Sequence, residues 1–252
     1  MIDCEGKRLL VVGASVSIGE TVALEAARRG AQVAVVARRK DRLDALVEAM
    51  GPGSTAIAAD VTAAEDCAEL VARAVETLGG LDWLVYTPAL FMLRTLDEVT
   101  AEEWRRVFDV GVIGAALVTR AALPHLAPGV GRVAWFSSDS TASNPHWAGL
   151  ASYAVSKVAL EKLMECWRFE RPDVCFTMVY VGSAEGSDGP AAGGWTEEQV
   201  ARFVPQWAAR PKSVQPREVV AENVLAALSS PSYVERVGVV APRYVATAEG
   251  PS

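Results

Sequence analysis

Short apolar runs alternate with longer amphipathic segments along most of this chain of 252 residues. An apolar run of about four to eight residues between turn residues predicts a buried β-strand, and apolar positions that repeat every three to four residues or so predict a helix. Strands are predicted at residues 7–12, 31–37, 54–59, 81–86, 131–137, 174–181 and 234–240. Helices are predicted at residues 20–29, 41–50, 63–78 and 100–122, around residues 152–164, and at residues 195–209 and 216–228.

This alternation of strands and helices predicts β-α-β units, in which successive strands run parallel and the connections are right-handed. We therefore predict a single α/β domain over residues 1–252, with a doubly wound parallel sheet of about seven strands and helices on both faces. In such a sheet, ligands bind beyond the carboxyl ends of the strands. Arg38, Asp60 and Ser138 each follow a predicted strand at that edge.

The stretch after the sixth predicted strand has the composition of a loop. Residues 182–194 are rich in Gly, Ser, Ala and Pro, which predicts a mobile segment. A short amphipathic helix is predicted next, at residues 195–209. Because the loop leaves the sheet at the binding edge, residues 182–210 are predicted to form a mobile substrate loop and lid helix that close over the site.

The turn at residues 13–19 joins the first predicted strand to the first predicted helix. Backbone N–H groups and the positive end of a helix dipole at such a turn favour the pyrophosphate of a dinucleotide. The alternative is a structural turn without a ligand. Its position in the first β-α unit favours the dinucleotide. The candidate cofactor-binding residues in this turn are Gly13, Ser15, Ser17, Ile18 and Gly19.

The end of the second predicted strand indicates which dinucleotide to expect. An acidic residue there would accept hydrogen bonds from the ribose 2′-hydroxyl of NAD(H). Ala37 and Arg38 occupy that place, and the planar guanidinium of Arg38 suits a 2′-phosphate. The alternative is that the basic cluster at residues 38–40 is a solvated start of a helix. We expect NADP(H) in preference to NAD(H).

Tyr153 and Lys157 lie one helical turn apart in a segment with helical periodicity, which puts both side chains on one face of a helix. A phenol keeps its proton up to a pKa near ~10, and a neighbouring ammonium lowers that pKa. Such a tyrosine can exchange a proton with a substrate oxygen near neutral pH. The alternative is a surface pair on an amphipathic helix. The polar residues at the same sheet edge favour the catalytic interpretation.

Composition excludes several other classes of protein. The net charge of −7 leaves no basic surface for a nucleic acid. No apolar run reaches the ~18 residues of a membrane span, and the first residues lack a signal-peptide layout. The chain has two histidines, and its four cysteines include no C-x-x-C pair, so we expect no metal site and reduced thiols. A cytoplasmic protein without a nucleic-acid or membrane partner is predicted.

These motifs resemble the short-chain dehydrogenase/reductase family over nearly the whole chain. The motifs that carry the resemblance are Gly13-x-x-x-Ser17-x-Gly19, Asp60-Val61, Ser138 and Tyr153-x-x-x-Lys157. The resemblance implies a Rossmann-type fold and an oxidoreductase that interconverts a carbonyl and an alcohol of a small molecule with NADP(H). It implies that Asp60 contacts the adenine and that Val61 lies in the same cofactor site. It also implies a homodimer or homotetramer, because helices pair between subunits in this family.

The resemblance also assigns roles in catalysis. Tyr153 is then the general acid/base, while Lys157 lowers the pKa of Tyr153 and binds the nicotinamide ribose. A serine at the end of the fifth strand is expected to hydrogen-bond the substrate oxygen. Ser138 holds that place and is favoured. Ser140 is the rival, because it precedes Tyr153 by thirteen residues, the usual spacing of the family.

Three positions depart from the family pattern. Ser17 replaces the middle glycine of the turn, and residues 86–89 read Tyr-Thr-Pro-Ala where the family has Asn-Asn-Ala-Gly. Gly111 replaces an asparagine that, in the family, helps to hold a water of the proton relay, largely through its backbone carbonyl. Gly111 keeps the carbonyl, loses the side chain and loosens the helix by about 1 kcal/mol relative to alanine.

Three functions are consistent with these features. The first is an NADP(H)-dependent oxidoreductase in which Tyr153 transfers the proton. The second is a non-redox enzyme of the same fold, a lyase or cyclase, that uses Tyr153 as acid/base. The third is a cofactor-binding regulatory protein with a vestigial site. The retention of Ser138, Tyr153 and Lys157 together argues against the third function, and the first is favoured. The residues expected to line an apolar substrate pocket, with core or lid packing as the alternative for each, are Phe91, Met92, Leu93, His146, Trp147 and Trp195.

Overall fold

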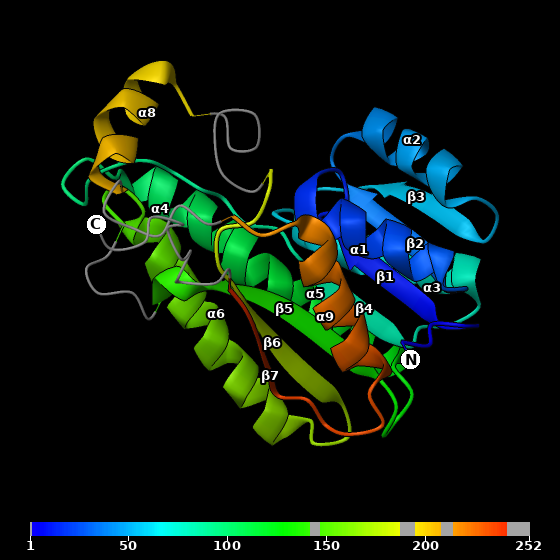
Figure 1. Cartoon of the computed structure of the whole chain (residues 1–252). Helices are drawn as coiled ribbons and strands as arrows, with labels where there is room; N and C mark the ends of the chain where they lie inside the picture. The colour runs from blue at the N-terminus through cyan, green and yellow to red at the C-terminus, as the bar shows by residue number, and fades with distance from the viewer. Residues whose placement is uncertain (1, 142–146, 187–194, 208–213, 241–252) are drawn as a thin grey trace, which may run out of the picture.

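The computed structural model describes residues 2–141, 147–186, 195–207 and 214–240. Its centre is a sheet of seven parallel strands in the order β3-β2-β1-β4-β5-β6-β7 (Figure 1). The strands are β1 (Arg8–Val12), β2 (Gln32–Ala37), β3 (Ser54–Ala58), β4 (Trp83–Tyr86), β5 (Arg132–Ser138), β6 (Cys175–Val181) and β7 (Arg236–Val239). The sheet winds outward in both directions from β1, which confirms the predicted doubly wound α/β architecture. The predicted strand ends differ from these by one or two residues.

Helices cover both faces of the sheet. They are α1 (Ser17–Arg28), α2 (Lys40–Met50), α3 (Ala64–Leu78), α4 (Ala101–Phe108), α5 (Gly114–Ala122), α6 (Ala151–Glu170), α8 (Glu197–Phe203) and α9 (Arg217–Ser229). Helices α1, α2 and α9 pack on one face, where Figure 1 shows α1 beside α9. Helices α3, α5 and α6 pack on the other. Each central strand is therefore covered twice, which explains its continuous apolar sequence.

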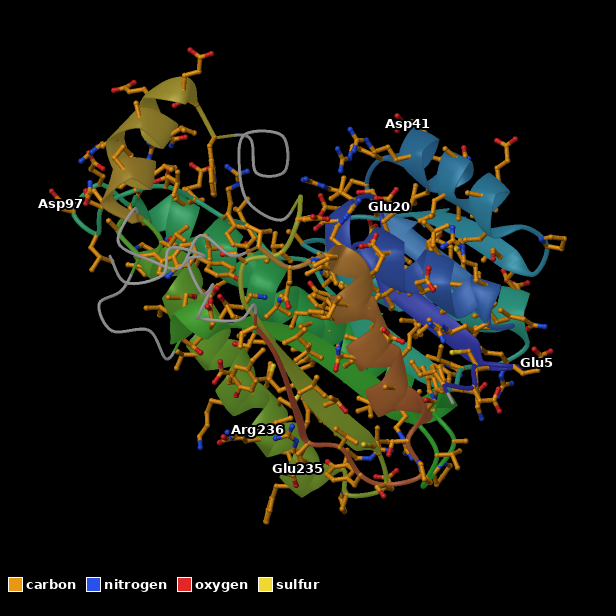
Figure 2. All side chains as sticks on the ribbon, viewed as in Figure 1. Glu5, Glu20, Asp41, Asp97, Glu235 and Arg236 are labelled. Atoms are coloured by element: carbon orange, nitrogen blue, oxygen red, sulfur yellow. The ribbon has the colours of Figure 1, made fainter. Side chains whose placement is uncertain are left out.

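Adjacent residues of one strand show this double burial. Leu10 and Val11 of β1 are both fully buried, Leu10 against α3 and α5 and Val11 against α1. Charged side chains lie on the outside instead: Asp41 on α2 and Glu235 before β7 both point into solvent (Figure 2). The apolar pattern that predicted the strands is thus the pattern of a sheet between two helical layers.

The region predicted as one helix at residues 100–122 consists of three pieces. Helix α4 begins with a capping box, in which Thr100 and Glu103 exchange side chain-to-backbone hydrogen bonds. A π-helical turn follows at Asp109–Ile113, and α5 continues from Gly114. The predicted long helical region is therefore confirmed, because the backbone stays helical through the π-turn. The π-turn itself was not predicted.

The described part of the predicted lid helix is also shorter than residues 195–209. Helix α8 is followed by a 3-10 turn at Val204–Trp207, where Pro205 has no N–H to continue an α-helical ladder. Residues 187–194 of the predicted loop and residues 208–213 lie outside the described residues.

The helical region Ala101–His125 has the length and composition of a membrane span, with a mean hydropathy of 1.5 over its most apolar window. In that window, 44% is buried inside the fold. The core helix of a folded domain meets the same criterion, so this feature alone is weak support for a membrane span.

The turn between β1 and α1 requires glycine at two places. Gly13 has a φ of 89°, and a Cβ atom there would lie 2.3 Å from the Oγ1 atom of Thr87. A Cβ at Gly19 would lie 2.5 Å from the carbonyl oxygen of Gly13. Ser17, in contrast, is the sole non-glycine residue with a positive φ in the described part of the chain, at 58°. This conformation costs an L-residue about 1–2 kcal/mol.

We predict that Ser17→Gly raises the free energy of unfolding by about 1 kcal/mol, because glycine adopts a positive φ without strain. The Ser17 hydroxyl is also buried without a hydrogen-bond partner among the described residues, so its removal breaks no bond seen there. Chemical denaturation of both proteins measures the difference. In the control, Ser15→Gly, we expect no gain, because Ser15 has no positive φ to relieve. A Ser17→Gly protein less stable than its parent would contradict this account.

Candidate active site

A cavity of about 540 Å³ lies at the carboxyl ends of the strands. All the residues predicted to bind the cofactor or to take part in catalysis line this one cavity. From the cofactor set they are Gly13, Ser15, Ser17, Ile18, Gly19, Arg38, Asp60 and Val61, and from the catalytic set they are Ser138, Ser140, Tyr153 and Lys157. The sheet therefore brings together residues up to 144 positions apart (from Gly13 to Lys157). Their individual roles remain predictions.

Lys157 is held deep beside Tyr153. Its side chain is 2% exposed, and its Nζ atom lies 5.6 Å from the centre of the Tyr153 ring. Nζ donates a 2.6 Å hydrogen bond to the carbonyl oxygen of Phe136, on β5. Burial lowers the pKa of Lys157 to about 8, and the nearby carboxylate of Glu161 acts in the opposite direction. The ammonium is thus fixed in position and only weakly favoured over the neutral amine.

Phe91 covers the Tyr153 ring. The two rings are stacked, with centres 4.2 Å apart and planes 24° from parallel. The carbonyl oxygen of Phe91 accepts a 3.2 Å hydrogen bond from the indole Nε1 of Trp195, just before α8. Gln199 of α8 donates to the carbonyl oxygen of Leu93. The segment before and within α8 is therefore tied to the loop that positions the Tyr153 ring. Sequence analysis placed Phe91 in the pocket but gave no sign of the stack.

The two candidate serines lie side by side. Ser138 is the last residue of β5, and Ser140 lies in a 3-10 turn at Asp139–Thr141. The Ser138 Oγ atom accepts a 3.1 Å hydrogen bond from the backbone N–H of Ser140, which leaves the Ser138 proton available to another acceptor. The Ser140 hydroxyl is buried and has no partner among the described residues. Both hydroxyls remain candidates to bind a substrate oxygen.

At the other end of the cavity, the donors suit an anionic dinucleotide. Helix α1 begins at Ser17, so its free N–H groups face the turn. Arg38 lines the cavity, and so does Arg39, whose Nη2 atom donates a 3.0 Å hydrogen bond to the hydroxyl of Ser15. Sequence analysis missed Arg39, although the basic cluster contained the signal. Two guanidinium groups beside a helix N-terminus fit phosphate groups.

Two of the residues that depart from the family pattern, Tyr86 and Thr87, make hydrogen bonds beside the cavity. The Tyr86 hydroxyl donates a 2.5 Å hydrogen bond to the carbonyl oxygen of Val110. The Thr87 hydroxyl donates to the carbonyl oxygens of Val12, at 2.9 Å, and Gly13, at 3.2 Å. These side chains thus connect the end of β4 to the π-turn and to the glycine turn. The sequence showed only that they were unusual.

The predicted apolar pocket is divided between two cavities. Phe91 and Trp147 line the large cavity. Met92, Leu93 and Trp195 line an adjoining cavity of about 150 Å³, which Phe91 also lines. His146 lies outside the described residues. The apolar residues closest to Tyr153 are therefore a smaller set than the sequence suggested.

We predict that burial of Lys157 makes stability depend on pH. Below about pH 8 the amine is charged in both the folded and the unfolded chain, so the full cost of burying a charge applies. As pH rises from about 8 towards 10.5, the folded chain loses the proton first, and stability relative to a neutral side chain increases. Between about pH 7 and about pH 10, the free energy of unfolding should therefore rise by about 2 kcal/mol more than in Lys157→Met.

Chemical denaturation of both proteins at each pH measures this difference. Subtracting one pH dependence from the other cancels the contributions of the other titrating groups, which are common to the two proteins. Parallel pH dependences would show that Lys157 keeps an ordinary pKa in the folded state.

Comparison with known proteins is consistent with this geometry. The sequence model of the family described as short chain dehydrogenase matches residues 7–185. The 11-beta-hydroxysteroid dehydrogenase-like 2 protein of Arabidopsis thaliana is 36% identical over 183 residues, which is 70% of this chain and 59% of that protein. The 11-beta-hydroxysteroid dehydrogenase A of Sesamum indicum is 34% identical over 190 residues, 73% of this chain and 54% of that protein. The chain thus spans less than two thirds of the length of these relatives.

Solved structures match over more of the chain. A dehydrogenase/reductase from Sinorhizobium meliloti 1021 superposes with a TM-score of 0.80 and 28% identity, over 95% of each chain. A short chain dehydrogenase from Burkholderia cenocepacia J2315, in complex with NADP, gives a TM-score of 0.78 and 28% identity, over 94% of this chain and 97% of that one. Sheet order, family match and structural likeness agree: the chain belongs to the short-chain dehydrogenase/reductase family of oxidoreductases.

Proposed function

We propose that this protein is an NADP(H)-dependent oxidoreductase that interconverts a carbonyl and an alcohol, with Tyr153 as the general acid/base. The observation that carries the proposal is the lining of one cavity by the glycine turn, Arg38, Ser138, Tyr153 and Lys157. The family supports redox chemistry, and the related proteins named above are dehydrogenases.

In the reduction, Tyr153 donates its phenolic proton to the carbonyl oxygen of the substrate, while the oxygen also accepts a hydrogen bond from Ser138 or Ser140. The ammonium of Lys157, buried beside the ring, stabilises the phenolate that remains. The Phe136 carbonyl keeps that ammonium in place. The bound nicotinamide supplies the hydride for the substrate carbon. Oxidation of the alcohol uses the same groups in reverse.

Arg38 and Arg39 support the choice of NADP(H). Both line the cavity next to Ser15, and Arg39 contacts the Ser15 hydroxyl. A 2′-phosphate between the two guanidinium groups would accept charge-assisted hydrogen bonds, whereas a 2′-hydroxyl would leave both cations without an anionic partner from the cofactor. Asp60 and Val61, at the end of β3, would lie against the adenine.

The substrate end of the cavity favours a small molecule with an apolar body. Phe91, Trp147 and Leu150 line the cavity that Tyr153 lines. Flat apolar groups pack well on aromatic side chains. The segment at residues 195–203 would cover such a substrate, since Trp195 and Gln199 are bonded to the loop that carries Phe91.

The surface supports a homodimer or homotetramer. Ile113, Val155 and Val158 are each about half exposed, at 47%, 48% and 51%. They lie on the π-turn and on the exposed side of α6, and a second copy could cover them.

The four cysteines are free thiols, which supports a cytoplasmic location.

We predict that Tyr153→Phe lowers kcat by about 10²–10⁴-fold, because it removes the proton that the reaction transfers. The dissociation constant for NADPH should change little, since the ring and its stack on Phe91 remain. A screen of aldehydes and ketones, followed at the nicotinamide absorbance, provides the substrate. The matched control is Tyr233→Phe, a tyrosine 47% exposed and outside the cavity.

Full turnover by Tyr153→Phe would refute the mechanism. Binding of NADPH without turnover of any carbonyl by the parent protein would favour the regulatory alternative. Tyr153-dependent product formation without a change in the nicotinamide absorbance would favour a lyase or cyclase.

We also predict that Arg38→Ala and Arg39→Ala each weaken NADPH binding by roughly 10-fold or more, which is the loss expected for a charge-assisted hydrogen bond. Binding of NADH should change by less than about 2-fold, because NADH lacks the 2′-phosphate. Fluorescence titration with both cofactors measures this. Arg42→Ala on α2, exposed and outside the cavity, is the control for a general loss of positive charge. Equal losses for NADPH and NADH would overturn the assignment.

A further inference from the structure

In the π-turn at Asp109–Ile113, the carbonyl oxygen of Val110 does not accept the hydrogen bond from Gly114 that it would accept in an α-helix. At the end of the turn, the N–H of Gly114 donates to the carbonyl oxygen of Asp109, five residues earlier. In an α-helix the same N–H would bond the carbonyl oxygen of Val110, four residues earlier. One extra residue is thereby accommodated in the turn. Single π-turns inside α-helices are frequent at functional sites.

The Tyr86 hydroxyl bonds the Val110 carbonyl oxygen, which the Gly114 N–H does not bond. This hydroxyl, at the end of β4, donates a 2.5 Å hydrogen bond to the carbonyl oxygen of Val110. The side chain is 1% exposed, and burial raises the pKa of Tyr86 well above its ordinary value. The phenol therefore stays protonated and acts as a donor. The carbonyl oxygen that the Gly114 N–H would bond in an α-helix is therefore bonded by Tyr86 instead.

Gly114 leaves room for the Tyr86 hydroxyl because it has no side chain. A Cβ atom at this position would lie 2.5 Å from the Tyr86 hydroxyl oxygen and 2.9 Å from the carbonyl oxygen of Val61. Any other residue would push the phenol away from Val110. The turn thus depends on a tyrosine on β4 and on the absence of a side chain on α5.

The turn packs directly against the part of α6 that carries Tyr153. Gly111, at the middle of the turn, is buried, and a Cβ there would lie 3.6 Å from the Ser156 hydroxyl oxygen. That hydroxyl donates a 2.7 Å hydrogen bond to the carbonyl oxygen of Tyr153. Asp109 and Val110 also line the large cavity. A change of backbone in the turn would therefore reach the Tyr153 segment through Ser156.

We propose that Tyr86 is a positioning residue for the reaction: by holding the Val110 carbonyl it keeps the π-turn open, and the turn sets the position of Tyr153 on α6. This inference rests on the proposed function. Without the phenol, the Gly114 N–H would return to Val110 and the turn would become α-helical. One residue would then leave the turn, so α4 would shift by about 1.5 Å and rotate by about 100° relative to α5 unless the chain relaxes elsewhere.

The test compares Tyr86→Phe with the parent protein. Phenylalanine keeps the ring and removes the donor, so we expect kcat to fall by roughly 10-fold or more while the dissociation constant for NADPH changes by less than about 2-fold, a displaced catalytic group being sensitive to shifts near 1 Å. The control is Thr177→Val, which removes a buried hydroxyl that donates to the carbonyl oxygen of Val234, outside the cavity. It should lower stability without lowering kcat.

Hydrogen exchange provides a second readout that does not depend on activity. In Tyr86→Phe, protection of the amides at residues 109–114 should change several-fold relative to that of β1, whereas Thr177→Val should leave this ratio unchanged. If Tyr86→Phe fails to fold, Gly114→Ala tests the same contact from the other side and should give the same pair of effects.

The outcomes separate this inference from the proposed function. Unchanged kcat in Tyr86→Phe, with an active parent protein, would overturn the positioning role and leave the proposed function standing. Unchanged relative exchange at residues 109–114 would overturn the account of the turn. A parent protein without turnover would remove the proposed function, and with it the catalytic role of Tyr86, even where exchange supports the turn.

Discussion

The hydrogen bond from the Lys157 ammonium to the Phe136 carbonyl joins helix α6 to strand β5 at the site. Burying an ammonium costs several kcal/mol unless it is well bonded, so this contact constrains how α6 lies on the sheet. Once it is made, Tyr153 stands one turn away, over the same cavity as the end of β5. The geometry of the proposed acid/base group therefore follows from where a buried charge finds its acceptor.

Two of the departures from the family pattern, Tyr86 and Thr87, make contacts that connect neighbouring elements of the site. Tyr86 and Thr87 follow each other at the end of β4, and their hydroxyls bond the π-turn and the glycine turn respectively. The first contact requires glycine at 114, and the second fills the space that only glycine leaves at 13. The site is thus framed by contacts that differ from the family pattern.

The sequence predicted the sheet because parallel strands covered by helices on both sides are apolar along nearly their whole length. Strands β1 and β5 both show such a run of buried residues. The sequence also predicted that the candidate site residues lie together, because the ends of such strands converge; Gly13 and Asp60 do line one cavity with Tyr153 of α6. It could not predict the π-turn, where the Val110 carbonyl oxygen accepts a hydrogen bond from a hydroxyl 24 residues away in the chain. Nor could it separate Arg38 from Arg39, because the direction of each side chain depends on the backbone at the strand end.

The most direct measurement of the central claim is transfer of deuterium from NADPH labelled at C4 of the nicotinamide. The protein would be incubated with each of the two C4 epimers and a panel of aldehydes and ketones, and the alcohols analysed by mass spectrometry. The account predicts that deuterium from one epimer, and not from the other, appears on the carbinol carbon. Tight binding of NADPH with no deuterium in any product would contradict it.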